Sequence, residues 1–135
     1  MLLRFSLLSS VFVGFIALAQ PDSAPYGAAA VETLRRLGLW EKVQPKLVYA
    51  ENIGMAKQYA ASGNTEAAFT AYSLVIKDGG KALLVDEKMH RPIEQALGIV
   101  KGSKNPDAAR RYTQFVLSPT GGAILESYGY LAPAR

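Results

Sequence analysis

Apolar and polar residues alternate along this chain in a way that predicts short helices interleaved with short strands. The helical period is clearest from Ala28 to Leu37, where Val31 and Leu34 share one face and charged residues lie off it. Gly38 follows directly, and glycine is the residue that most often ends a helix. The first helix is therefore expected over this range.

The same criteria place the other elements. Three more helices are predicted from their periodicity and from residues that favour helix starts: Ile53 to Ser62 after the cap Asn52, a helix begun by Asn105-Pro106, and a helix begun by Ser118-Pro119 and ended by Gly129. Apolar runs predict strands at Leu47 to Tyr49, Ala67 to Tyr72, Ala82 to Val85 and Gln95 to Val100. Strands that alternate with helices indicate an α/β fold.

The N-terminal segment from Met1 to Ala19 allows two interpretations. Arg4 precedes an apolar run of about 14 residues, which ends in the small-residue pattern of a signal-peptide cleavage site. The run is shorter than the ~20 residues that span a bilayer as a helix, so an export signal is favoured over an anchor. The alternative is a buried strand that ends at Ala19. The rest of the chain, 20–135, is expected to form one domain.

Composition excludes several kinds of function. The chain has 135 residues and a formal net charge of +4, but its Lys and Arg residues are scattered and form no basic stripe for nucleic acid. It has no cysteine and a single histidine, His90, so cysteine-based and multi-histidine metal sites are excluded. The carboxylates fall at turns and caps, and no nucleophile lies beside a base. No enzyme activity is predicted.

Three junctions between loops and helices are candidates for anion binding. They are the Pro-Tyr-Gly turn containing Tyr26, the helix start at Ile53, and Tyr72 at the end of a predicted strand. In an open α/β sheet such junctions gather at one edge, where backbone N–H groups and hydroxyls can bind an oxyanion without a cation. The alternative is that Tyr26 and Tyr72 are half-buried tyrosines with no ligand.

The order of several short motifs is more specific than any one of them. The motifs are Pro21-Asp22-Ser23-Ala24-Pro25-Tyr26-Gly27, Leu37-Gly38-Leu39-Trp40, Glu51-Asn52-Ile53, Ser62-Gly63-Asn64, Pro92-Ile93-Glu94-Gln95 and Tyr128-Gly129-Tyr130. Together they resemble the periplasmic molybdate-binding proteins of ABC transporters, from about Ile16 to Pro133.

This resemblance implies a type II periplasmic-binding-protein fold, in which two α/β lobes close over molybdate or tungstate. Carried over by motif, Tyr26 and Ile53 offer backbone N–H groups and Tyr72 offers its hydroxyl to the oxyanion. The anion is the transported ligand and no cofactor is implied. The expected partner is the permease of an ABC transporter, and the expected location is the periplasm.

The chain departs from the family pattern in length. Family members are nearly twice as long, and two of their hydroxyl-bearing ligand positions lie in a first lobe that has no counterpart here. We therefore expect a truncated member with an incomplete site, consisting mainly of the second lobe and the C-terminal helices that return to the first. Its partner is then a separate first-lobe chain or a second copy. The alternatives are a secreted, non-catalytic interaction module or a non-functional fragment.

Overall fold

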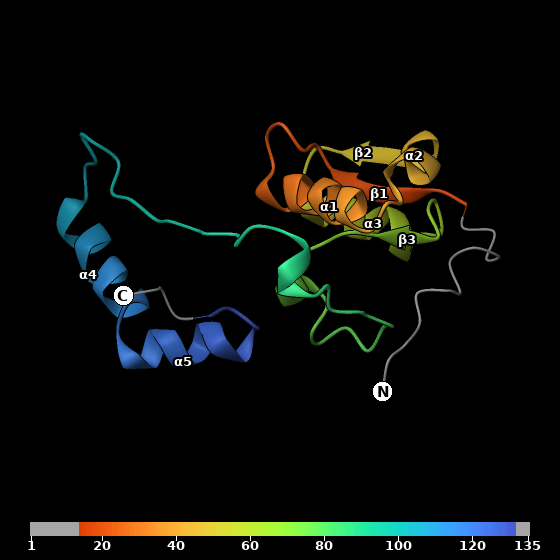
Figure 1. Cartoon of the computed structure of the whole chain (residues 1–135). Coiled ribbons are helices and arrows are strands. Elements are labelled where there is room, and N and C mark those ends of the chain that lie inside the picture. The colour runs from red at the N-terminus through yellow and green to blue at the C-terminus, as the bar shows by residue number, and fades with distance from the viewer. Residues whose placement is uncertain (1–13, 132–135) are drawn as a thin grey trace. The chain divides into compact units, whose positions relative to one another are not determined.

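The computed structural model describes residues 14–131, which form two compact units (Figure 1). Of the described residues, the first unit contains 14–71 together with Leu84–Ile93. The second contains Tyr72–Leu83 and residues 94–131. The chain therefore passes between the units three times, and each unit is described separately below.

A three-stranded parallel sheet is the centre of the first unit. Its strands are β1 (Ile16–Ala19), β2 (Leu47–Ala50) and β3 (Ala67–Ala68), in the order β2-β1-β3. Ile16 pairs with Leu47 on one side and with Ala67 on the other. All four residues of β1 are buried, because a central parallel strand is covered on both faces.

Helices cover both faces of β1. The helices and 3-10 turns of this unit are α1 (Pro25–Arg36), α2 (Trp40–Val43), η2 (Gln44–Lys46), α3 (Ile53–Ala61) and η4 (Glu87–Met89). Leu18 packs with Ala30 and Val31 of α1, whereas its neighbour Ala17 packs with Ala56 of α3. Successive side chains of a strand point to opposite faces, so α1 and α3 lie on opposite sides of the sheet.

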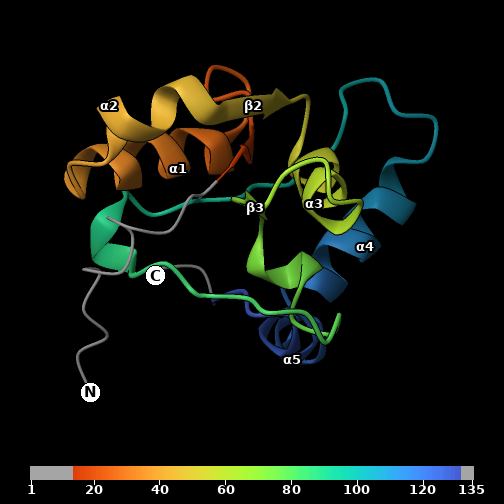
Figure 2. The same ribbon diagram turned by 90° about the vertical axis from the view of Figure 1, so that its right-hand side faces the viewer.

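The second unit contains the short 3-10 helix η3 (Tyr72–Leu74) and the helices α4 (Pro106–Val116) and α5 (Pro119–Ser127). α4 and α5 run in different directions, and α5 is seen nearly end-on in Figure 2. The Ser73 and Tyr130 hydroxyls are 3.0 Å apart, and the Lys77 ammonium lies 3.9 Å from the centre of the Tyr128 ring. η3 thus contacts the chain at the end of α5. Gly121 is the one buried residue among those described in this unit.

The predicted helices are confirmed, with small shifts at their ends. α1 begins three residues earlier than expected, at Pro25, because proline is favoured in the first turn of a helix, where its missing N–H is not needed. Gly38 and Gly129 follow α1 and α5 with positive φ angles of 66° and 81°. The side chains of Asn52 and Ser118 cap α3 and α5 as expected, but that of Asn105 makes no capping bond to α4.

Two predicted strands are wrong and a third is shorter than expected. The stretches 82–85 and 95–100 have no regular secondary structure and pair with no described strand, and Leu83 and Val100 are 95% and 78% exposed. A strand needs a neighbour for its backbone hydrogen bonds, and the apolar pattern alone does not supply one. The strand expected over Ala67 to Tyr72 ends at Ala68. At the N-terminus, Ile16–Ala19 is a paired strand, and residues 1–13 lie outside the described part.

Candidate oxyanion-binding edge

Two helices begin at the same edge of the sheet in the first unit. Ala19 and Ala50 are paired at the carboxyl ends of β1 and β2, and the Gln20 N–H donates to the Ala50 carbonyl at 2.9 Å. A short turn leads from Ala19 into α1, and Glu51-Asn52 leads from Ala50 into α3. The N-termini of α1 and α3 therefore lie side by side at this carboxyl edge, where ligands bind in open α/β sheets.

The start of α1 is held close to the end of β1. The Ala24 N–H donates to the Gln20 carbonyl at 2.9 Å, which closes the turn before the helix. A Cβ atom at Gly27 would overlap the carbonyl oxygen of Ala19, so only glycine allows this approach. Pro25 has no N–H, and the Tyr26 N–H is thus the first backbone donor of α1.

The start of α3 is fixed by two side chains. The Asn52 carboxamide oxygen accepts the Met55 N–H at 2.9 Å, as expected of an N-cap. The Thr70 hydroxyl, which follows β3, donates to the carbonyl of Ile53 at 3.0 Å. Ile53 is the first residue of α3, and the Thr70 bond ties its carbonyl to the segment after β3. No local sequence pattern indicated this contact.

The loops at this edge contain no cationic side chain. The stretches 19–27, 50–54 and 69–71 include no Lys or Arg, and their only charged residues are the exposed Asp22 and Glu51. The donors available from the backbone are neutral N–H groups at positive helix ends. Within residues 14–131 no cluster of His, Asp or Glu has the composition of a metal site.

Tyr72 lies in the second unit, unlike the other two predicted site residues. It begins η3 and is 41% exposed, and its ring lies against Gly129. The structure therefore brings Tyr26 and Ile53 to one edge of the first unit. The role of the Tyr72 hydroxyl remains a prediction.

The one clear pKa shift among the described residues lies elsewhere on α1. The pKa of the Glu32 carboxyl is lowered, mainly because the carboxylate accepts a hydrogen bond from the Arg91 N–H. Desolvation raises this pKa, and the hydrogen bond from Arg36 lowers it further. Glu32 is seven residues after Pro25, or about 10 Å along the helix. It belongs to a separate polar network, described below.

A family model described as bacterial extracellular solute-binding protein matches residues 7–131. The chain belongs to this family. It is 41% identical over 117 residues to the molybdate-binding protein ModA of Rhodobacter capsulatus, covering 86% of the chain and 46% of that protein. It is 40% identical over 120 residues to ModA of Azotobacter vinelandii, covering 85% of the chain and 47% of that protein. The chain thus spans about half the length of these relatives.

A solved structure agrees with this assignment. The periplasmic molybdate-binding protein of Azotobacter vinelandii matches 96% of the chain with a TM-score of 0.86 and 28% sequence identity, and the match covers 58% of that protein. The fold is therefore part of a type II periplasmic-binding-protein fold, as predicted. Membership of a solute-binding family also supports a binding component rather than an enzyme. Within the described residues, no helix has the length and apolar character needed to cross a membrane.

Proposed function

We propose that this chain binds a tetrahedral oxyanion of the molybdate or tungstate type, as the solute-binding component of an ABC transporter in the periplasm. The observation that carries the proposal is the pair of helix N-termini at one sheet edge. The names of the ModA relatives support molybdate as the ligand. The proposed donors are the backbone N–H groups of Tyr26 and Ile53 and the hydroxyl of Tyr72.

Two backbone donors alone give weak binding. A hydrogen bond to a charged partner contributes about 1.5–3 kcal/mol, so two of them give about 3–6 kcal/mol, or dissociation constants of roughly 0.05–10 mM. Tight binding needs further donors, and the relatives contain as much chain again as the part matched here. We propose that a complementary lobe supplies the missing donors.

The Ile53 N–H offers the sharpest test of the site. Ile53 is the first residue of α3, where proline is accepted, and Asn52 before it is extended (φ −151°, ψ 170°), as a residue before proline must be. Ile53→Pro therefore removes the proposed donor and keeps the helix, whereas Ile53→Val keeps the N–H. Calorimetric titration with molybdate, and with tungstate and sulfate for comparison, is expected to show wild-type affinity in Ile53→Val and binding weakened about tenfold or more in Ile53→Pro, the equivalent of one hydrogen bond to an anion.

Two side-chain variants test the remaining donors. Tyr26→Ala keeps the backbone N–H and is expected to retain molybdate binding, because the side chain is not the proposed donor. Tyr72→Phe removes only the hydroxyl and is expected to weaken binding about tenfold or more, the equivalent of one hydrogen bond to an anion. Unchanged affinity in Tyr72→Phe removes Tyr72 from the site. No binding by the wild type at millimolar molybdate contradicts binding by this chain alone.

Thr70 gives a test of positioning at the same edge. Thr70→Val has nearly the same shape but no hydroxyl, so the Ile53 carbonyl loses its bond to the segment after β3. We expect weaker molybdate binding in Thr70→Val and recovery in Thr70→Ser. The carbonyl carbon shift of Ile53 in NMR reports the same bond without ligand. If the Ile53 carbonyl carbon shift is unchanged in Thr70→Val, Thr70 does not hold the Ile53 carbonyl in place.

A second candidate function, an interaction module, is favoured by the exposed apolar side chains of the second unit. Tyr112, Leu117 and Ile124 are 65%, 64% and 49% exposed. We propose that a lobe from another chain or a second copy covers them. Gel filtration with light scattering separates these cases, because a second copy gives a dimer of the chain alone. A stable monomer that binds molybdate contradicts the interaction module.

A further inference from the structure

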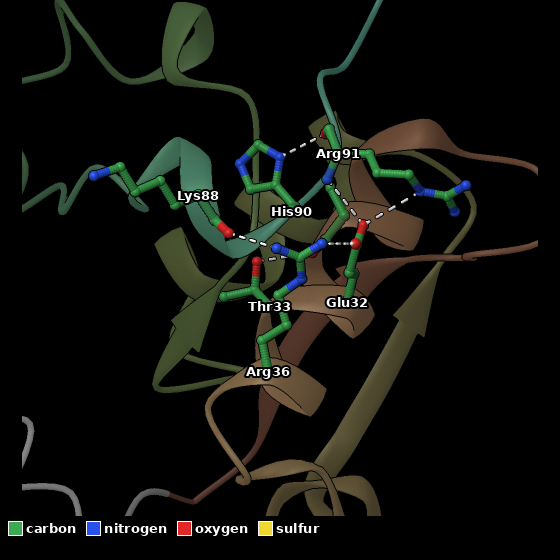
Figure 3. A network of polar contacts seen from close by, with 7 residues as sticks. Glu32, Thr33, Arg36, Lys88, His90 and Arg91 are labelled. Carbon is green, nitrogen blue, oxygen red and sulfur yellow. Dashed lines mark hydrogen bonds and ion pairs between the residues drawn. The ribbon is translucent and has the colours of Figure 1, made fainter.

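The segment from Asp86 to Arg91, here called the strap, lies against α1 in the first unit (Figure 3). It contains η4 and is part of the stretch Leu84–Ile93, which returns to the first unit between two stretches of the second. No residue of the strap is buried, and only Met89 and His90 are even half-buried. Apolar packing therefore contributes little to its attachment.

Polar contacts to α1 hold the strap instead. One carboxylate oxygen of Glu32 accepts the Arg91 N–H at 2.9 Å, and the other accepts the Arg36 guanidinium at 2.7 Å. The same guanidinium donates to the carbonyl of Lys88 at 2.6 Å. Figure 3 shows Glu32 and Arg36 reaching from one face of α1 to the strap backbone. Two side chains of the helix thus bind the strap at Lys88 and at Arg91.

The strap also carries bonds of its own that define its shape. The Asp86 carboxylate accepts the Lys88 N–H at 2.9 Å, and the Met89 N–H donates to the Asp86 carbonyl at 2.8 Å. His90 Nδ1 lies 2.8 Å from the Arg91 carbonyl. These contacts stay inside the strap and do not depend on α1. The strap can therefore separate from the helix without losing its local turn.

We propose that Glu32 and Arg36 act as a latch that holds the strap on α1, and that the strap opens as a unit while the sheet stays folded. The Glu32 side chain is 24% exposed, and it contacts both the backbone N–H and the guanidinium of Arg91 in the strap. It also binds Arg36 on its own helix, whereas the sheet is held by buried residues elsewhere. Local opening of weakly packed segments is common in folded proteins. The strap lies within Leu84–Ile93, and the chain belongs to the second unit on either side of that stretch.

The test uses Glu32→Gln, with Glu41→Gln as the matched control. Glu41 is an exposed carboxylate on α2 in the same unit. We expect trypsin to cleave after Lys88 several-fold faster in Glu32→Gln than in the wild type or the control. Hydrogen exchange of the Arg91 amide, which donates to Glu32, is expected to rise in parallel.

A second amide separates local opening from general loss of stability. The Phe69 N–H donates to the Ala17 carbonyl at 2.8 Å and reports the sheet. Its exchange is expected to be unchanged in Glu32→Gln. Faster exchange at both amides shows that the strap does not open independently, and an unchanged cleavage rate after Lys88 shows that Glu32 is not the latch. Neither measurement involves an oxyanion, so either result leaves the proposed binding function untouched.

The two latch residues are also tested together. Arg36→Gln removes the bonds to both Lys88 and Glu32, and the double variant with Glu32→Gln completes a mutant cycle. We expect the double variant to increase cleavage after Lys88 by less than the product of the single effects, because both residues act on one contact. Strictly multiplicative effects contradict a shared latch.

Discussion

The first unit has a packed core, whereas the second is held together by surface contacts. Leu18, Ala17 and Ala56 are below 1% exposed in the first unit, while Gly121 is the one buried residue among those described in the second. Both units contain helices with apolar stripes. The difference is the parallel sheet, which gives α1 and α3 a surface to cover, whereas the described part of the second unit contains no strand. Stability of the chain is therefore expected to reside in the first unit.

A cavity in the core is the strongest way to test this contrast. Leu18→Ala is expected to lower the free energy of unfolding by about 2–5 kcal/mol, because Leu18 is fully buried between β1 and α1. Ile124→Ala, on an exposed side chain of α5, is expected to change it by less than about 1 kcal/mol. Trp40, the single tryptophan, packs near Leu18, so its fluorescence during urea unfolding reports the first unit. Equal effects of the two variants contradict the contrast.

Substitution of glycine by alanine is expected to destabilise the protein at Gly27 and to stabilise it at Gly122. Gly27→Ala places a Cβ against the Ala19 carbonyl and forces α1 away from β1, at an expected loss of about 1–3 kcal/mol. Gly122 lies within α5 with nothing within 4 Å of a new Cβ. Gly122→Ala is therefore expected to stabilise α5 by about 0.5–1 kcal/mol through helix propensity. Thermal unfolding followed by circular dichroism measures both, and destabilisation by Gly122→Ala means that α5 is packed there.

Two asparagines before helices test the caps in the same way. Asn52→Ala removes the bond to the Met55 N–H and is expected to destabilise the first unit by about 1 kcal/mol. Asn105 precedes α4 but makes no side-chain capping bond, so Asn105→Ala is expected to change stability by only a few tenths of a kcal/mol. Urea unfolding of the two variants checks the difference. A larger effect at Asn105 means that its side chain caps α4 in solution.

The smallest expected effect is the pH dependence of the strap. The Arg91 N–H and Arg36 lower the pKa of Glu32 below its ordinary value of 4.5, so the folded protein binds this proton less readily than the unfolded chain. The contribution of Glu32 is complete above the ordinary value and is lost as the pH falls through the lowered one. Exchange of the Arg91 amide, corrected for its intrinsic pH dependence, is expected to rise over that acidic range.

The matched variant isolates Glu32 from the other groups on or near the strap. Asp86, Glu87, Lys88 and His90 lie in the strap, and Arg36 and Arg91 bracket the carboxylate. Glu32→Gln keeps all of them and removes only the titrating carboxyl. In Glu32→Gln, hydrogen exchange of the Arg91 amide is expected to be fast at every pH and to show no increase over the acidic range. A step of the same size in Glu32→Gln assigns the titration to another group.

The sequence predicted the helices better than the strands, for a physical reason. The helices α1 and α3 are predictable from their periodicity, caps and terminal glycines, because all of these signals lie within a few residues of the helix. The stretches 82–85 and 95–100 have the apolar composition of strands, but a strand forms only if a distant segment pairs with it. Their exposed leucine and valine side chains show that composition and pairing are separate conditions.

For the candidate edge, the sequence identified helix starts but not the contacts that fix them. Tyr26 and Ile53 were found because a loop before a helix has a local pattern. Thr70 was missed because a threonine near a strand end has no distinguishing pattern, and its partner Ile53 is 17 residues away. The bond from Arg91 to Glu32 spans 59 residues and has no local pattern either. Long-range polar contacts become visible only in the folded chain.

The central position of β1 has a consequence for synthesis. The strand precedes both of its partners, and pairing needs Leu47 on one side and Ala67 on the other. During translation, the Ile-Ala-Leu-Ala segment must therefore wait for about 50 further residues to emerge before the sheet is complete. An apolar strand with two open edges is a target for chaperones and for misassembly during that interval. Slower elongation downstream of Ala19 is thus expected to lower the yield of folded chain, although no contact in the finished protein changes.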